Sequence, residues 1–379
     1  MVNKINIFKQ FLLIIVLFFA SAKVNAQHEE EHGSSATSPN HHEKFEAGKT
    51  IIGHVADNHQ WHLWGHVAIP LPVIVKTDKG IEVFSSAHFG HEGEGVYKGE
   101  NYNYTTKAGN IVVVDDNNIE NEEATASLWD FSLTKNTVAM LVSMIIMVWM
   151  FLSVAKAYTK NKGKAPKGLQ SFVEPLILFV RDDIAKPSIG VNRYQRFMPF
   201  LLTVFFFIWI NNLVGLIPFF PFGANVTGSI SIAMTLAAFV LIITFVVANK
   251  HYWHHVFAMP GVPPWVLIIL TPIEILGLVL RPFVLMIRLF ANITAGHIIA
   301  LAFFSLIFIF GEMSTGAGLG VSVLSLVFTV FMGALELLVA FLQAYVFTLL
   351  SAIYFGAAVD EGHDVNNHAD DYLPEAAHH

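Results

Sequence analysis

The sequence contains no cysteine, which excludes disulfide bonds and thiol chemistry. Charged residues are scarce, at 13%, whereas hydrophobic residues make up 54% of the 379 residues and the mean hydropathy is +0.55. This composition excludes an ordinary soluble domain and is typical of an integral membrane protein. No Gly-x-x-x-x-Gly-Lys-[Ser/Thr] loop occurs either, so we expect no nucleotide site of that kind.

The first 26 residues have the features of a secretory signal peptide. Lys4 and Lys9 flank the start, a short apolar core follows, and Val24-Asn25-Ala26 is a small-residue cleavage site. An uncleaved membrane anchor is the alternative. In both cases the segment that follows is exported.

Residues 27–134 form a polar, His-rich region that we expect in the periplasm. Short alternating apolar runs between residues 51 and 114, separated by Gly, Asp and Asn, predict a small β-rich unit. His59, His62 and His66 could ligate a metal ion if they shared a helix, but the strand-and-loop pattern favours no metal site. The sequence indicates no function for this region.

Five apolar segments follow, so the sequence predicts an all-α polytopic membrane domain over residues 135–360. The segments cover about 136–155, 198–219, 228–248, 265–310 and 320–356. As continuous helices the last two would be about 69 and 55 Å long, at about 1.5 Å per residue, so we expect both to be strongly tilted.

Charge predicts the orientation of these segments. Five lysines and no acidic residue lie between residues 156 and 167, which places this loop in the cytoplasm. Residues 168–196 are too charged to span the bilayer and predict an amphipathic helix at the cytoplasmic interface. An exported N-terminus and five spans then leave the polar tail, residues 361–379, in the cytoplasm.

The fourth apolar segment carries polar residues at helical spacing. Glu274, Arg281 and Arg288 are seven residues apart and form one stripe on a helix, and Asn292 follows Arg288 by four residues. A charge at the bilayer centre costs roughly 2.5–3.5 kcal/mol, and arginine cannot lose its proton to escape this cost. We interpret Arg281 as a residue that extends to the membrane surface. For Arg288, the alternative to a functional role is a structural ion pair.

Depth along the last two helices predicts two separated proton paths. Glu274 lies about 21 Å to the cytoplasmic side of Arg288, and His297 lies about 13 Å to the outer side. If Gln343 on the returning helix is level with Arg288, Glu336 lies close to the level of His297. Carboxylates and imidazoles inside a membrane are typical of proton relays, and a fixed cation between them blocks a direct leak. We therefore expect two half-paths, a barrier and a separate carrier of the proton.

Two stretches of the sequence carry a family resemblance. They are Arg281-Pro-Phe-Val-Leu-Met-Ile-Arg288-Leu-Phe-Ala-Asn292-Ile-Thr-Ala-Gly296-His297 and Glu336-Leu-Leu-Val-Ala-Phe-Leu-Gln343-Ala-Tyr345. They closely resemble subunit a of F-type ATP synthases, and the resemblance covers roughly residues 168–360. It implies a bacterial inner-membrane protein that acts as a proton-channel stator. The implied partners are the ring of c subunits, which carries the proton, the peripheral-stalk b subunits, the rest of the synthase and the lipid bilayer. It implies no cofactor, no nucleic acid and no catalytic chemistry in this subunit.

The resemblance also implies residue roles. Arg288 resembles the stator arginine that faces the ring carboxylate, and Glu274 resembles a cytoplasmic half-channel carboxylate. His297 and Glu336 resemble the outer half-channel pair in the mitochondrial order, which is reversed in many bacterial relatives. Further polar residues of the implied proton path are Asn292, Gln343 and Asn212.

Two features depart from the family pattern. Gly215 stands where some relatives hold Asp, and the family core does not require the exported region. Asn211 and Asn212 together are also typical of a plain helix–helix contact.

The alternative function is a self-contained secondary transporter that binds an anionic substrate through Arg288. The sequence has no inverted repeat or paired broken helices that would favour it.

Overall fold

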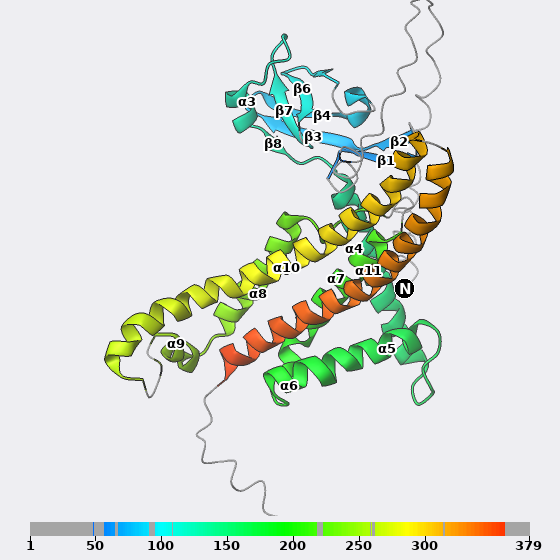
Figure 1. The fold of residues 1–379 in the computed structure, drawn as a ribbon. Coiled ribbons are helices and arrows are strands. Elements are labelled where there is room, and N and C mark those ends of the chain that lie inside the picture. Colours follow the sequence, from blue (N-terminus) through cyan, green and yellow to red (C-terminus); the bar gives the residue numbers. More distant parts are fainter. Residues whose placement is uncertain are drawn as a thin grey trace, which may run out of the picture. The chain divides into compact units, whose positions relative to one another are not determined.

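The chain is described here from a computed structural model, shown in Figure 1. The residues that the structure describes are 48, 57–64, 67–90, 95–107, 109–217, 223–257, 259, 262–313 and 315–360. The predicted signal peptide and the predicted C-terminal tail lie outside these residues.

The predicted β-rich unit is present, and its described strands form three small antiparallel sheets. One sheet pairs β1 (Gln60–Trp64) with β2 (Val67–Pro70). The second has the order β4-β3-β8, from β3 (Pro72–Thr77), β4 (Gly80–Ser85) and β8 (Trp129–Asp130). The third has the order β5-β6-β7, from β5 (Tyr97–Lys98), β6 (Asn103–Lys107) and β7 (Asn110–Val114). The helical turns η1 (Ser86–Phe89) and α3 (Glu122–Ala126) complete the unit.

Alternation along β3 and β4 explains how this unit builds a core. Val73, Val75 and Phe84 point inward and are buried, together with Tyr104 of β6. Glu82 points inward as well and is buried. Its carboxylate accepts hydrogen bonds from two backbone N–H groups, at residues 100 and 101, and from the hydroxyl of Tyr104 at 3.0 Å. The charge is therefore buried with its hydrogen bonds satisfied.

Nine helical elements follow this unit in the described part of the chain. They are α4 (Lys135–Lys160), α5 (Leu169–Phe179), the π-helical η2 (Val180–Ala185), α6 (Lys186–Ile189), α7 (Tyr194–Gly215), α8 (Ile230–Val247), α9 (Lys250–Phe257), α10 (Pro264–Met313) and α11 (Thr315–Val359). By length and composition, five of them can cross a membrane: α4, α7, α8, α10 and α11. The prediction of five apolar helices and a polytopic membrane protein is confirmed at this level.

Helix α7 is the most buried of these five helices and forms the centre of the helical core. Phe205 and Phe206 of α7 are fully buried and pack with Leu285 and Leu289 of α10 and Phe347 of α11. Helices α10 and α11 run side by side in Figure 1. Much of their apolar surface stays exposed, as expected for helices that meet lipid or another subunit.

Helices α5, η2 and α6 occupy the stretch in which the sequence predicts an interfacial helix. Their position at the membrane surface stays a prediction, as does the tilt of α10 and α11. At 50 and 45 residues these last two helices are longer than an upright crossing of a roughly 30 Å hydrocarbon core needs.

Candidate functional site

Arg288 lies near the middle of α10 on an exposed face. Among the residues that the structure describes, no ion pair involves Arg288. The alternative of a structural ion pair for Arg288 therefore finds no support within this part of the chain. An arginine in an apolar helix that has no ion-pair partner among the described residues of its chain is available to a charged group on another molecule.

Glu274 and Arg281 form an ion pair on α10, to one side of Arg288. Nη2 of Arg281 donates a hydrogen bond to Oε1 of Glu274 at 3.0 Å across two helical turns. The guanidinium also lies 6.0 Å from the centre of the Tyr354 ring on α11. Arg281, which the sequence analysis interpreted as a residue that extends to the membrane surface, thus has a partner on its own helix.

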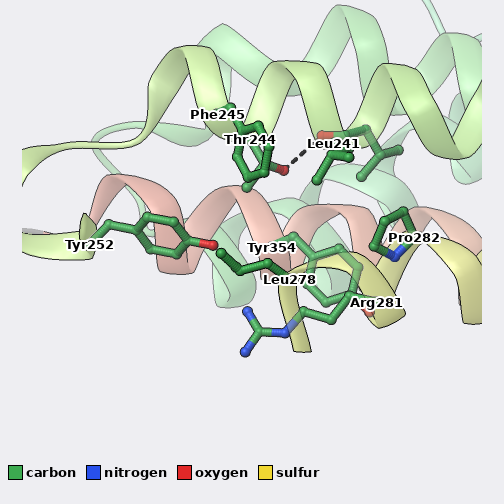
Figure 2. A pocket seen from close by; sticks show the side chains of 9 residues that line it. Leu241, Thr244, Phe245, Tyr252, Leu278, Arg281, Pro282 and Tyr354 are labelled. Atoms are coloured by element: carbon green, nitrogen blue, oxygen red, sulfur yellow. Dashed lines mark hydrogen bonds between the residues drawn. The ribbon is translucent and has the colours of Figure 1, made fainter. Parts of the chain in front are cut away.

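A small apolar pocket lies behind this pair, between α8, α9, α10 and α11 (Figure 2). Tyr252 of α9 and Tyr354 of α11 face it from two sides, and Thr244 of α8 faces it from a third. The hydroxyl of Thr244 is already bonded to the carbonyl of Val240 at 2.7 Å. Figure 2 shows the guanidinium of Arg281 directed away from α8, so it is the aliphatic stem of Arg281 that lines the pocket.

His297 of α10 and Glu336 of α11 meet on the other side of Arg288. Nδ1 of His297 lies 3.8 Å from Oε1 of Glu336, and the two side chains are 18% and 14% exposed. The sequence suggested that these residues lie at the same level, and the structure brings them together. Both line a cavity of about 350 Å³, which is roomy enough for water and has polar groups to hold it.

Gly296 makes room for this pair. A Cβ on Gly296 would lie 2.6 Å from Oε1 of Glu336, closer than real Cβ contacts allow. The carboxylate therefore lies directly against the α10 backbone, next to His297. Sequence reasoning did not identify Gly296 as a site residue, although the glycine stands beside His297 in the chain.

Asn292 and Gln343 bridge α10 and α11 between Arg288 and the His297–Glu336 pair. Nδ2 of Asn292 donates to Oε1 of Gln343 at 3.1 Å, and Gln343 is buried. The sequence analysis took Gln343 as level with Arg288 only as a condition, and in the structure Gln343 bonds to Asn292, one helical turn further along α10. Both amides can donate and accept, so the two side chains can pair with each other.

Asn212 lines the same cavity from α7. Its Nδ2 donates to the carbonyl of Ala340 at 3.3 Å, and its Oδ1 accepts a hydrogen bond from the hydroxyl of Thr227. Asn211 instead accepts a hydrogen bond from Ser143 of α4 at 2.8 Å, as expected for a helix–helix contact. The two adjacent amides therefore have different surroundings.

Three residues of the loop between α7 and α8 lie close to residues that line the cavity or adjoin it, and sequence reasoning missed them. They are Ala224, Asn225 and Thr227. A Cβ on Gly215 would lie 3.2 Å from the carbonyl oxygen of Ala224 and 3.9 Å from Nε2 of His297. The sequence marks this loop only as a Pro/Gly turn, so nothing in it signals a contact with α10.

The histidines of the N-terminal β-rich unit do not form a metal centre in the part of the chain that the structure describes. His59 is buried, and its Nε2 lies 3.5 Å from Oδ2 of Asp130. Burial alone would raise the pKa of Asp130, but the neighbouring His59 imidazole and the hydrogen bond from the Ser132 N–H outweigh it and hold that pKa below its usual range. His62 lies on a strand, and His66 lies outside the described residues.

Comparisons with known proteins find matches over both parts of the chain. A family model described as ATP synthase A chain matches residues 137–356, and one described as a domain of unknown function matches residues 50–131. The ATP synthase subunit a of Chloroherpeton thalassium is 42% identical over 248 residues, which are 64% of this chain and 72% of that protein. The subunit a of Myxococcus xanthus is 41% identical over 254 residues, or 65% of this chain and 79% of that protein.

Proposed function

The chain belongs to the ATP synthase A chain family, and we propose that it is the proton-conducting stator subunit of an F-type ATP synthase. In this role it is a multi-pass membrane protein that faces the ring of c subunits. It offers two offset half-channels, which load and unload the ring carboxylates as the ring turns. Proton flow through them is coupled to ATP synthesis elsewhere in the complex.

The observation that carries this proposal is the arrangement along α10. Arg288 is exposed and has no ion-pair partner in the described part of the chain, while acid-containing pairs stand on both sides of it. Glu274 is about 21 Å away in one direction and His297 about 13 Å away in the other, at about 1.5 Å per residue. The distance between Glu274 and His297 along the helix is therefore larger than a hydrogen bond or a single water can bridge.

Each group then has a role in the proposed path. His297 and Glu336 accept protons from the outer side, where imidazole and carboxylate exchange protons near neutral pH. Asn212, Asn292 and Gln343 are the polar groups between this pair and Arg288.

Arg288 has two effects that follow from its permanent charge. It repels a hydrated proton and so closes the direct route between the two half-channels. It also stabilises the ionised form of a ring carboxylate that comes beside it. Glu274, paired with Arg281, is the cytoplasmic carboxylate that receives the released proton.

The proposed orientation of the chain across the membrane follows from the charge pattern. The Lys-rich segment at residues 156–167 supports a cytoplasmic position for the loop after α4. The N-terminal unit is then periplasmic, behind a cleaved signal peptide, and the C-terminus is cytoplasmic. The peripheral-stalk b subunits are further proposed partners, on surfaces other than the one that faces the ring.

The alternative of a self-contained transporter is not supported. The chain belongs to a family whose matched members are named as subunits of a synthase. A transporter would also work alone in liposomes, whereas the proposed stator needs the ring to carry protons past Arg288.

The test compares Arg288→Ala with wild type in membrane vesicles that contain the complete synthase. Loss of ATP-driven pumping, with passive proton leak retained or increased, is the expected result. The matched control is Arg196→Ala, an exposed arginine at the start of α7 outside the proposed path. Pumping that survives Arg288→Ala would overturn the proposal.

A further inference from the structure

The exported unit holds the first membrane helix at its N-terminus. Oδ1 of Asp57 accepts a hydrogen bond from the backbone N–H of Asn136 at 3.0 Å. The carbonyl of Asn58 accepts one from the N–H of Lys135 at 2.9 Å. Lys135 and Asn136 begin α4, and the first amides of a helix have no acceptor within it. The chain some 79 residues earlier thus supplies acceptors for two of the first amides of α4.

Trp61, at the end of this segment, packs against the helical part of the chain. It is 4% exposed and shares one buried cluster with Ala139 of α4 and with Ala224 and Val226 of the loop between α7 and α8. Ala139, Ala224 and Val226 are each 1% exposed or less. An indole is the side chain with the largest apolar area to bury, so this contact holds the loop firmly.

The same loop also lies close to Gly215 and Asn212 of α7, next to the His297–Glu336 cavity. The carbonyl of Ala224 and Nε2 of His297 both lie beside Gly215, at 3.2 and 3.9 Å from the position of a Cβ there. Thr227 of the loop donates to Asn212, which lines the cavity. The loop is therefore part of the surroundings of His297.

Thr294 provides a second connection between the loop and α10. Its hydroxyl donates to the carbonyl of Gly228 at 3.4 Å and lies 3.5 Å from Nδ2 of Asn225. Thr294 precedes His297 by three residues, so both lie on one face of α10. A shift of the loop would thus act on the helix turn that carries His297.

We propose that residues 57–61 of the exported unit are a positioning element of the outer half-channel. Through Trp61 they fix the loop of residues 223–229, and the loop fixes the surroundings of His297. The inference rests on the proposed function of the His297–Glu336 pair. It gives the exported unit a role in proton entry, because a misplacement of about 1 Å can slow a transfer step by up to about 100-fold.

The functional test uses proteoliposomes with the complete synthase, in which the pH on the outer side is varied at constant cytoplasmic pH. We expect Trp61→Ala to lower the rate of ATP synthesis by about threefold or more where outer protons are limiting. The dependence on cytoplasmic pH should stay unchanged. Trp61→Phe should recover most of the rate. The matched control is Trp129→Ala, a tryptophan of the same unit that is 67% exposed.

A labelling test reports on the loop itself. Because the chain has no cysteine, Val226→Cys introduces a single thiol into it. In an otherwise unchanged chain this thiol is buried and should react slowly with a water-soluble maleimide added on the outer side. Adding Trp61→Ala should raise the labelling rate by about tenfold, since exposure controls access to a thiol.

Faster labelling together with the altered outer-pH profile supports the inference. Unchanged labelling, or faster labelling with a normal outer-pH profile, overturns it. If Trp61→Ala fails to assemble into the synthase, Trp61→Leu is scored by the same two criteria. His297→Ala distinguishes a failure of the proposed function from a failure of this inference. If His297→Ala leaves pumping intact, the proposed function is wrong. If His297→Ala abolishes pumping but Trp61→Ala has no effect, only the positioning role of residues 57–61 is wrong.

Discussion

The carboxylate of Glu336 on α11 occupies the space that a side chain at Gly296 on α10 would need. Oε1 of Glu336 would lie 2.6 Å from a Cβ there, and the Cγ and Cδ atoms would lie 3.1 and 3.3 Å from it. Glu336 thus lies beside His297 in space that residue 296, which has no side chain, leaves open.

Gly296→Ala should displace the Glu336 carboxylate from His297. We expect ATP-driven proton pumping to fall by about tenfold or more, since a shift of about 1 Å at a transfer site is costly. Gly277→Ala on the same helix is the control, because a Cβ there meets nothing within 4 Å. Pumping equal to that of the control would show that the close approach of Glu336 to Gly296 is unimportant.

The His297–Glu336 pair should tolerate exchange better than loss. His297→Ala and Glu336→Ala each remove one partner and should nearly abolish coupled pumping. The double variant His297→Glu with Glu336→His keeps an imidazole and a carboxylate in contact, so we expect it to retain measurable pumping. An exchanged pair as inactive as either single variant would show that the two residues do not act together.

Arg288→Lys should disable the motor although it retains a positive charge. Lysine can lose its proton in an apolar setting and lacks the planar fork that matches a carboxylate. ATP synthesis in proteoliposomes should fall to the level of Arg288→Ala. A fully active Arg288→Lys synthase would contradict the role of a permanent charge as the barrier.

The Asp130–His59 contact should stabilise the N-terminal β-rich unit at neutral pH. The pKa of Asp130 is lowered in the folded state, so its contribution is present above the unfolded value and is lost as the pH falls through the folded one. Asp130→Asn should lower the stability at pH 7 by no more than about 1 kcal/mol, because the carboxylate is 33% exposed and screened.

The measurement for this prediction is thermal unfolding of the purified chain at pH 7 and at acidic pH. The difference in melting temperature between wild type and Asp130→Asn should shrink below about pH 4, where the Asp130 carboxyl group of the unfolded chain becomes protonated. A difference that stays constant with pH would mean that the Asp130 charge does not contribute.

Much of the helical part could be predicted from the sequence, because apolarity and helical spacing are local properties. Runs of apolar residues predicted five helices, and the seven-residue spacing placed Glu274, Arg281 and Arg288 on one face of α10. The level of Glu336 beside His297 followed from the rise per residue, on the assumption that Gln343 is level with Arg288. Apart from that assumption, these predictions need only the regular geometry of a helix.

Tertiary structure alone decided which of these side chains make contact. Arg281 pairs with Glu274, and Gln343 of α11 bonds to Asn292 of α10. The clearance at Gly296 and the contact of Trp61 with the loop before α8 join residues far apart in the chain. Such contacts depend on how close two backbones come and which rotamers then fit, and no local pattern in the sequence carries that information.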